Sequence, residues 1–252
     1  FVGCGPGDPD LITVKAKKLI QKADVVVYSG SLIPPEILKL CKKARTYDAA
    51  KLVREEIFGL LKDNANIGQK VVRLHDGDPS IYGAIREQMD NLHKEKIDSV
   101  IIPGVTSFLA SAAALGAQLT LPGVTQTMII SRAEKRTKVP KREKISELAK
   151  HKATMIFYLS VHLLSDIVKE ALAGGYSKST PVGVVYRASW SDEKIITGTL
   201  GTITKKVREQ KITRTAIIII GDVIKPKSYE YSRLYDKSFS HGFRKAKAST
   251  KH

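Results

Sequence analysis

The chain has 252 residues, enough for one large domain or two modest ones, and 42% of them are hydrophobic and 27% charged. That composition is typical of an ordinary soluble globular protein, and two cysteines exclude a disulfide framework. The net charge of +17 indicates anionic partners, which leaves nucleic acid, a membrane surface and a small polycarboxylate or phosphate substrate open.

In the first half, short β-branched runs alternate with amphipathic segments, the pattern of a parallel α/β sheet. The strands expected are the opening "FV", "DVVVY" (24–28), "KVVRL" (70–74) and "SVIIP" (99–103). Between them, "TVKAKKLIQKA" and "YGAIREQMDNLHKEK" repeat apolar residues every three or four positions, as helices do. We therefore predict a doubly wound N-terminal domain over residues 1–117.

A second set of strands is expected after a linker at 118–124. It comprises residues 125–131, 153–159, 181–187, 194–200 and 215–221. Helical patterns separate most of these runs, and "HLLSDIVKEALAGG" is expected to end at Gly174 and Gly175. No repeat relates the halves, so we predict a different C-terminal domain over 125–231, followed by a basic tail over 232–252.

Cys4 and Cys41 indicate a cytoplasmic protein, because free thiols persist in a reducing compartment. Their spacing predicts no metal site, and each is expected to be a small apolar filler. No targeting segment is visible. The most apolar stretch, "FLASAAALGAQLTLPGV", is interrupted by polar residues and Pro122 and is shorter than the roughly 20 residues that span a membrane.

The glycine-rich stretch "GCGPGDPDLIT" (3–13) follows the first strand, and its composition is typical of a nucleotide-binding loop. It fails the dinucleotide fingerprint, since Asp8 stands at the sixth position and Asp24 precedes the second strand. It also lacks the Gly-Lys-Ser/Thr of a P-loop, and Asp8 would repel a pyrophosphate. Without a ligand, the stretch predicts a tight strand-to-helix turn with Asp10 or Thr13 as N-cap.

Two further loops follow strands of the same sheet, and ligands bind where such loops meet. In "HDGDPSIYGA", Gly77 permits a sharp turn, Asp78 is suited to capping, and Pro79 is suited to starting a helix. In "GVTSFLASAAA", Thr106 and Ser107 precede a helix whose N-terminus suits a carboxylate. The Asp78 carboxylate suits an ammonium or a ribose hydroxyl. S-adenosylmethionine combines an amino acid end with a nucleoside and carries no phosphate.

In order and spacing, "GCGPGDPDLIT", "HDGDPSIYGA" and "IPGVTS" resemble the tetrapyrrole methylases, over nearly the whole chain. The segments "SRAEKRTKVP" (131–140), "YRASWSDEKI" (186–195) and "SRLYDKSFSHGFRK" (232–245) are similar to the precorrin-4 C-11 methyltransferases of cobalamin biosynthesis within that family. The resemblance implies two α/β domains, each a mainly parallel or mixed sheet flanked by helices, with the ligand cleft between them. It also implies a homodimer.

The resemblance assigns nine residues to S-adenosylmethionine binding: Pro6, Gly77, Asp78, Ile81, Thr106, Ser107, Leu159, Ala188 and Ala216. The last three are expected to enclose adenine largely through backbone groups. Two positions depart from the family pattern, because Leu159 stands where relatives often carry methionine and Asp76 where many carry a second glycine.

The implied reaction is methyl transfer from S-adenosylmethionine to C-11 of precorrin-4 or cobalt-precorrin-4, with S-adenosylhomocysteine as the second product. The substrate's own electron-rich carbon is the nucleophile, so the protein's contribution is alignment, and no catalytic residue is assigned. His75 adjoins the cofactor loop, which is not sufficient to make it a general base.

Arginine side chains bind carboxylates in a bidentate manner, and a precorrin carries several. The expected substrate-binding residues are Arg132, Arg136, Arg187 and Lys135. Two alternatives stay open: an RNA methyltransferase of the same superfamily, and a basic binding protein without activity. Against RNA stands the absence of interleaved arginines and aromatics, with only 6% aromatic residues. We expect no nucleic acid or membrane partner.

Overall fold

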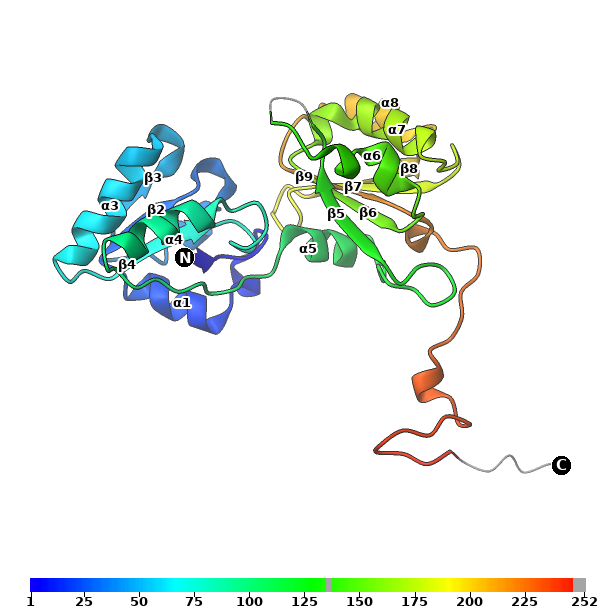
Figure 1. Cartoon of the computed structure of the whole chain (residues 1–252), viewed down its shortest axis with the longest axis horizontal. Coiled ribbons are helices and arrows are strands. Elements are labelled where there is room, and N and C mark those ends of the chain that lie inside the picture. The colour runs from blue at the N-terminus through cyan, green and yellow to red at the C-terminus, as the bar shows by residue number, and fades with distance from the viewer. Residues whose placement is uncertain (135–136, 247–252) are drawn as a thin grey trace.

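The N-terminal half of the chain forms a parallel four-stranded sheet in a computed structural model that describes residues 1–134 and 137–246 (Figure 1). The strand order is β1 (Val2–Gly3), β4 (Val71–His75), β2 (Val25–Tyr28) and β3 (Arg45–Asp48). All three neighbouring pairs are parallel. The carboxyl ends of these strands therefore meet at one edge, as the sequence predicts.

The predicted strand over residues 99–103 is reduced to a single bridge. Ile102 pairs with Val2 beside β1, donating its N–H to the Phe1 carbonyl and accepting from the N–H of Gly3. The prediction of a full strand is wrong because this segment runs along a two-residue edge strand, and Pro103 has no N–H to continue the ladder.

Helices cover both faces of the first sheet, which confirms the doubly wound arrangement. They are α1 (Val14–Gln21), α2 (Pro35–Leu38), α3 (Arg54–Asn66) and α4 (Ile85–Lys94). On one face, α1 and α2 bury Ile20 and Ile37 against Val26 and the even-numbered residues of β4. On the other, Leu61 of α3 and Leu92 of α4 pack against Val25 and Val27. Thr13 caps α1 by accepting from the N–H of Ala16 at 3.2 Å.

The C-terminal half forms a mixed five-stranded sheet, and all five predicted runs are strands. The order is β5 (Met128–Arg132), β6 (Thr154–Tyr158), β9 (Ala216–Ile220), β7 (Pro181–Tyr186) and β8 (Lys194–Thr199). Only β5 and β6 pair in parallel; the other neighbours are antiparallel.

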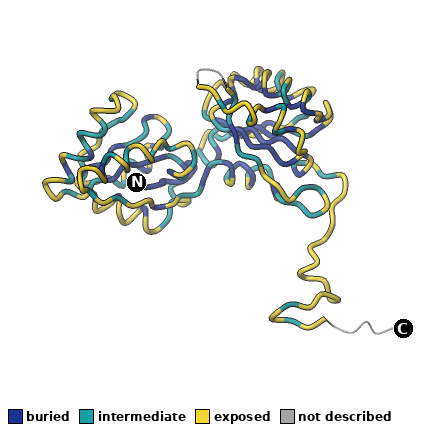
Figure 2. Tube along the Cα trace, in the orientation of Figure 1, coloured by how far each residue is buried: buried dark blue, intermediate teal, exposed yellow. Residues whose placement is uncertain are grey.

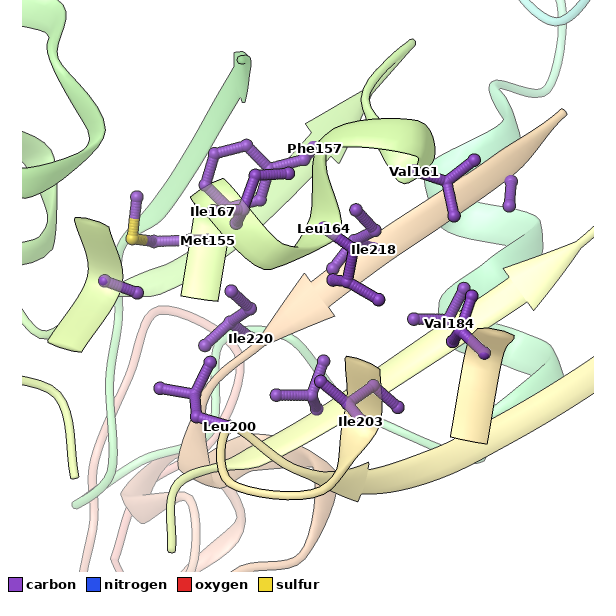
Figure 3. Close-up of a cluster of buried hydrophobic side chains, with 14 of the residues drawn as sticks. Met155, Phe157, Val161, Leu164, Ile167, Val184, Leu200, Ile203, Ile218 and Ile220 are labelled. Carbon is purple, nitrogen blue, oxygen red and sulfur yellow. The ribbon is translucent and has the colours of Figure 1, made fainter. Parts of the chain in front are cut away.

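One face of this sheet is covered by α6 (Ile145–Ala149), α7 (Leu164–Ala173) and α8 (Ile203–Glu209), and Figure 3 shows the apolar side chains between them and the strands. The chain leaves α7 at Gly174 and Gly175, as predicted, and Gly175 is left-handed (φ 96°).

The opposite face of the second sheet is covered by α5 (Ser107–Ala114), a helix that precedes the predicted linker. Its Phe108 and Ala112 pack against Ile156, Ile217 and Ile219. The first half of the chain therefore contributes a helix to the core of the second sheet. The domain boundaries stay a prediction.

Short 3-10 turns complete the described secondary structure: Pro9–Leu11, Gly30–Leu32, Ala49–Lys51, Lys141–Glu143, Val161–Leu163, Asp222–Ile224 and Arg233–Tyr235. The segment beyond the sixth of these turns extends away from both sheets and is largely exposed (Figures 1 and 2). Within residues 1–134 and 137–246, no helix has the length and apolarity to cross a membrane. Residues 247–252 of the predicted tail lie outside the described residues.

Candidate functional site

Three loops meet at the carboxyl edge of the first sheet, and glycines allow their close approach. Gly5 and Gly77 form an antiparallel bridge, with the Gly77 N–H donating to the Gly5 carbonyl at 2.8 Å. A Cβ on Gly3 would lie 2.6 Å from the Gly77 carbonyl oxygen and 2.8 Å from the Gly104 nitrogen. Only glycine fits there, so the residue type at position 3 is what lets the loops touch.

Asp8 and Asp78 both serve the backbone of these loops. Asp8 Oδ1 accepts from the N–H of Asp10 at 2.8 Å and caps the first 3-10 turn. Asp78 Oδ1 accepts from Ser80 N at 2.8 Å, and its Oδ2 accepts from Gly104 N at 2.9 Å. Asp78 thus fastens the second loop to the third, and both of its oxygens bind backbone N–H groups. Its binding to an ammonium or a ribose hydroxyl stays a prediction.

The predicted helix start at Pro79 is wrong. Residues 79–82 form turns, and α4 begins only at Ile85. Tyr82 (φ 55°) and Ala84 (φ 48°) adopt the left-handed conformation, which a right-handed helix excludes. This strained loop keeps Ile81 half-buried beside the site.

Tyr158, at the end of β6, joins the third loop to the second sheet. Its hydroxyl lies 2.6 Å from Thr106 Oγ1 and accepts from the N–H of Phe108 at 3.2 Å. The Thr106 hydroxyl therefore bonds to Tyr158 and caps no backbone N–H of α5. The ring centroids of Tyr82 and Tyr158 are 5.5 Å apart. Tyr158 therefore contacts the second loop through Tyr82 and the third loop through Thr106.

A loop of the second domain contacts the glycine-rich stretch directly. Trp190 Nε1 donates to the Pro6 carbonyl at 2.9 Å, and the Asp8 N–H donates to Ser189 Oγ at 2.9 Å. A Cβ on Gly7 would lie 2.1 Å from Trp190 Cδ1, so the indole packs flat on a glycine backbone. We call this set of contacts between residues 6–8 and 189–190 the Trp190 contact.

A cavity of about 330 Å³ lies between the two sheets, with walls from both halves of the chain. The N-terminal half contributes Pro6, Ser31, Leu32, Asp76 and Ser107. The C-terminal half contributes residues 158–162, Val185, Arg187, Ala188, Trp190 and residues 213–217.

Five of the nine predicted cofactor residues line this cavity: Pro6, Ser107, Leu159, Ala188 and Ala216. Gly77, Asp78 and Thr106 lie behind its wall, where they hold the loops together. Ile81 does not line it. The structure therefore brings the predicted positions together around one space, while their contact with a cofactor stays a prediction.

Three of the nine described non-glycine residues with positive φ line this cavity. Leu159, Arg187 and Thr215 are left-handed, with φ of 54°, 46° and 54°, and each directly follows or precedes a strand of the second sheet. All three line the cavity. Non-glycine residues adopt this conformation at a free-energy cost of about 1–3 kcal/mol, and such strain is concentrated at functional sites.

The predicted substrate residues are placed differently from one another. Arg187 lines the cavity, where its guanidinium lies 2.8 Å from Asp192 and 4.4 Å from the Trp190 ring centroid. Arg132 ends β5 outside the cavity lining, and it donates to the carbonyls of Thr137 (3.0 Å) and Lys138 (2.9 Å). Lys135 and Arg136 lie outside the described residues.

His75 does not face the cavity. It is buried on the far side of β4, 6.1 Å from the ring of Phe1, and burial together with Arg73 lowers its pKa to about 3. It stays neutral at physiological pH, with no hydrogen-bond partner for Nε2 among the described residues. His75 therefore does not reach the cavity and is not placed to act as a general base there.

Sequence reasoning missed three residues of the site: Asp76, Tyr158 and Trp190. Trp190 is the single tryptophan of the chain and lies in "YRASWSDEKI". The similarity of that segment to the methyltransferases could have identified this residue as part of the site. Asp76 was noticed only as a departure from the family pattern. No local pattern marks Tyr158, whose role depends on the contact between β6 and α5.

A cleft between two α/β domains, walled by strained backbone and glycine-rich loops, defines an enzyme that binds a small molecule between its domains. The chain belongs to the tetrapyrrole (corrin/porphyrin) methylases, whose family model matches residues 1–204.

Relatives support this assignment along nearly the whole chain. It is 54% identical over 247 residues to the cobalt-precorrin-4 C(11)-methyltransferase of Methanocaldococcus jannaschii, covering 98% of this chain and 95% of the relative. The crystal structure of a cobalamin biosynthetic enzyme, cobalt precorrin-4 methyltransferase, is 46% identical with a TM-score of 0.85, covering 89% and 95%. The uroporphyrin-III C-methyl transferase of Thermus thermophilus, complexed with S-adenosylhomocysteine, is 31% identical with a TM-score of 0.75, covering 89% and 97%.

Proposed function

We propose that this protein transfers the methyl group of S-adenosylmethionine to C-11 of precorrin-4 or cobalt-precorrin-4 in corrin ring synthesis. The observation that carries the proposal is the inter-domain cavity, whose lining includes Pro6, Ser107, Leu159, Ala188 and Ala216. These are five of the positions that the family resemblance assigns to the co-substrate. The similarity to C-11 methyltransferases, which extends over both domains, supports the choice of substrate.

The bound co-substrate supplies an electrophilic methyl on a sulfonium. A carbon–carbon bond to the tetrapyrrole forms as the sulfur–methyl bond breaks, and the tetrapyrrole then loses a proton. The protein's part is to hold the two reactants in line, which is worth about 7–11 kcal/mol in well-oriented reactions. The rigid loops described above suit that task. The buried, neutral His75 takes no part in it.

We assign the co-substrate's parts by the chemistry of the wall. Ser107 begins α5 and lines the cavity, and the positive end of the helix dipole there attracts a carboxylate. The left-handed residues Leu159, Arg187 and Thr215 line the cavity, and with Ala188 and Ala216 we assign them to adenine. In this proposal Gly77, Asp78 and Thr106 shape the wall from behind, and Ile81 closes its edge.

We propose that Arg132 and Arg187, with Lys135 and Arg136, bind the carboxylates of the tetrapyrrole. Arg187 supports this best by position, since it lines the cavity. We further propose a cytoplasmic homodimer without a nucleic acid partner. Buried free Cys4 and Cys41 agree with a reducing compartment, and light scattering after size-exclusion chromatography tests the dimer.

The deciding experiment incubates the protein with methyl-labelled S-adenosylmethionine and either precorrin-4 or its cobalt form. We expect one added methyl group by mass and its assignment to C-11 by NMR. Comparing the two substrates tests the cobalt requirement. Label in RNA, and none in either tetrapyrrole, would support the RNA methyltransferase alternative instead.

A further inference from the structure

Asp76 places a carboxylate in the cavity without a positively charged partner. It directly follows β4 and is the only acidic residue among the described residues of the cavity lining. Across the part of the chain that the structure describes, its side chain forms no ion pair and no hydrogen bond to another residue. In a protein with a net charge of +17, an unpaired carboxylate in the ligand cavity is unexpected.

Arg187 and Arg214 line the same cavity, but no ion pair joins either of them to Asp76 in the part of the chain that the structure describes. Burial raises the pKa of the carboxyl, while its own backbone N–H and Arg73 act in the opposite direction. The nearby guanidinium of Arg73 is directed elsewhere, since its Nη1 donates to the Val27 carbonyl at 3.1 Å and lies 3.3 Å from the Ser29 hydroxyl. Asp76 is half-buried, and a carboxylate that is partly removed from water and has no partner is stabilised by a cationic ligand.

Asp78, the neighbouring carboxylate, is set back from the cavity. Both of its oxygens accept backbone N–H groups of the loops, and it does not line the cavity. Recognition of positive charge in the ligand is therefore left to Asp76.

We propose that Asp76 is a specificity-determining residue that makes the site prefer the charged sulfonium of S-adenosylmethionine to the neutral thioether of S-adenosylhomocysteine. The inference rests on the proposed function. It adds a means of distinguishing the methyl donor from its spent product, because both molecules share the adenosine, the carboxylate and the α-ammonium and differ in the charge on sulfur.

The size of the cavity sets the magnitude of the effect. We take about 9 Å, the scale of a small-ligand cavity, as the separation between the sulfonium and Asp76. Two opposite unit charges at that separation and an effective dielectric constant of about 20 change a binding constant on the order of tenfold. The attraction ends when the methyl leaves, which favours exchange of product for fresh co-substrate.

The test compares Asp76→Asn with the wild-type protein by calorimetric titration of three ligands. They are S-adenosylmethionine, S-adenosylhomocysteine and sinefungin, an analogue with a charged amine in place of the methylated sulfur. We expect the variant to lose S-adenosylmethionine and sinefungin affinity about tenfold more than S-adenosylhomocysteine affinity, because all three share the α-ammonium and only the first two carry the second positive charge. Asp63→Asn, which removes an exposed carboxylate from α3, is the matched control and should change none of the three.

Equal weakening of all three ligands would overturn the inference, since it would place Asp76 against a group that they share or assign it a purely structural role. Unchanged affinities would overturn it too. If the wild-type protein binds neither S-adenosylmethionine nor S-adenosylhomocysteine, the proposed function itself fails. Thermal denaturation checks that the variant is folded, which we expect because the substitution keeps the shape of a half-buried side chain that forms no ion pair among the described residues.

Discussion

At the scale of single residues, burial decides which chemically reactive groups take part in the chemistry. Cys4 and Cys41 are buried on the α1 side of the first sheet, as the apolar-filler interpretation predicts. Burial raises the pKa of Cys4 to about 12 and that of Cys41 to about 11. Both thiols therefore stay protonated at pH 8, several pH units below those values, and a protonated thiol is a poor nucleophile.

We expect iodoacetamide at pH 8 to leave both cysteines unmodified in the native protein and to alkylate both in denaturant. Mass spectrometry counts the adducts directly. Rapid alkylation of either thiol without denaturant would show that the packing around it opens at low cost. Free cysteine added to the same reaction is the positive control.

Arg132 tests the substrate part of the proposal. Because it lies outside the cavity lining, Arg132→Ala should weaken tetrapyrrole binding by tenfold or more, the loss of a charge-assisted bidentate bond, and leave S-adenosylmethionine affinity within about twofold. Arg142→Ala is a suitable control, since that arginine is highly exposed and pairs only with the adjacent Glu143 among described residues. Calorimetry with each ligand measures both effects. An equal loss of both affinities contradicts the role.

At the scale of elements, the Trp190 contact joins a loop of the second domain to the first loop of the chain. Gly7→Ala should break it, because the new Cβ would meet the indole at 2.1 Å. Overpacking of this kind typically destabilises by about 1–3 kcal/mol. Since Trp190 is the only tryptophan, its fluorescence reports the change. We expect a red shift of the emission and weaker S-adenosylmethionine binding.

Gly242→Ala is the matched control for that variant, since nothing lies within 4 Å of a Cβ built there. It should leave the emission and the affinity unchanged. If Gly7→Ala gave the emission spectrum of the wild-type protein, the indole would not be packed on residue 7 in solution.

The elements also show what sequence can predict here and why. Runs such as "AIIII" and "PVGVVY" gave strands because their side chains are buried on both faces of a sheet. The loops met as predicted because the carboxyl ends of parallel strands share an edge. By contrast, β3 ("RTYD") was missed, since two of its four residues are exposed and it has no apolar run.

The site was harder to predict than the fold. Trp190 reaches Pro6 across 184 positions of the chain, and Asp78 uses its second oxygen on Gly104, 26 residues away. Neither pairing leaves a periodicity in the sequence. The family resemblance supplied the positions around the cavity. The role that we propose for Asp76 depends on the structure, which shows that Asp76 lines the cavity while Asp78 binds backbone N–H groups of the loops.

At the scale of the whole molecule, a ligand that touches both domains should stabilise them together. At a concentration of 100 times its dissociation constant, S-adenosylhomocysteine should add about 2.7 kcal/mol to the free energy of unfolding. For a chain of this size the melting temperature should then rise by roughly 5–10 °C. Differential scanning fluorimetry with and without ligand measures the shift, and adenosine at the same concentration controls for weak nucleoside binding. An unchanged melting temperature would contradict binding in the cavity.

The position of α5 determines where the two halves can move against each other. Because this helix is packed on the second sheet, a hinge at the linker 118–124 would separate Phe108 from Ile217. Gly104 is bonded to Asp78 of the first half and Thr106 to Tyr158 of the second, so we infer that the hinge lies between positions 104 and 106. We infer that Ser107 travels with the C-terminal half while Pro6 and Asp76 stay with the N-terminal half. Opening the protein would then separate Ser107, which we assign to the carboxylate of the ligand, from Asp76, which we assign to its sulfonium. A single domain motion would therefore remove both contacts and release the ligand.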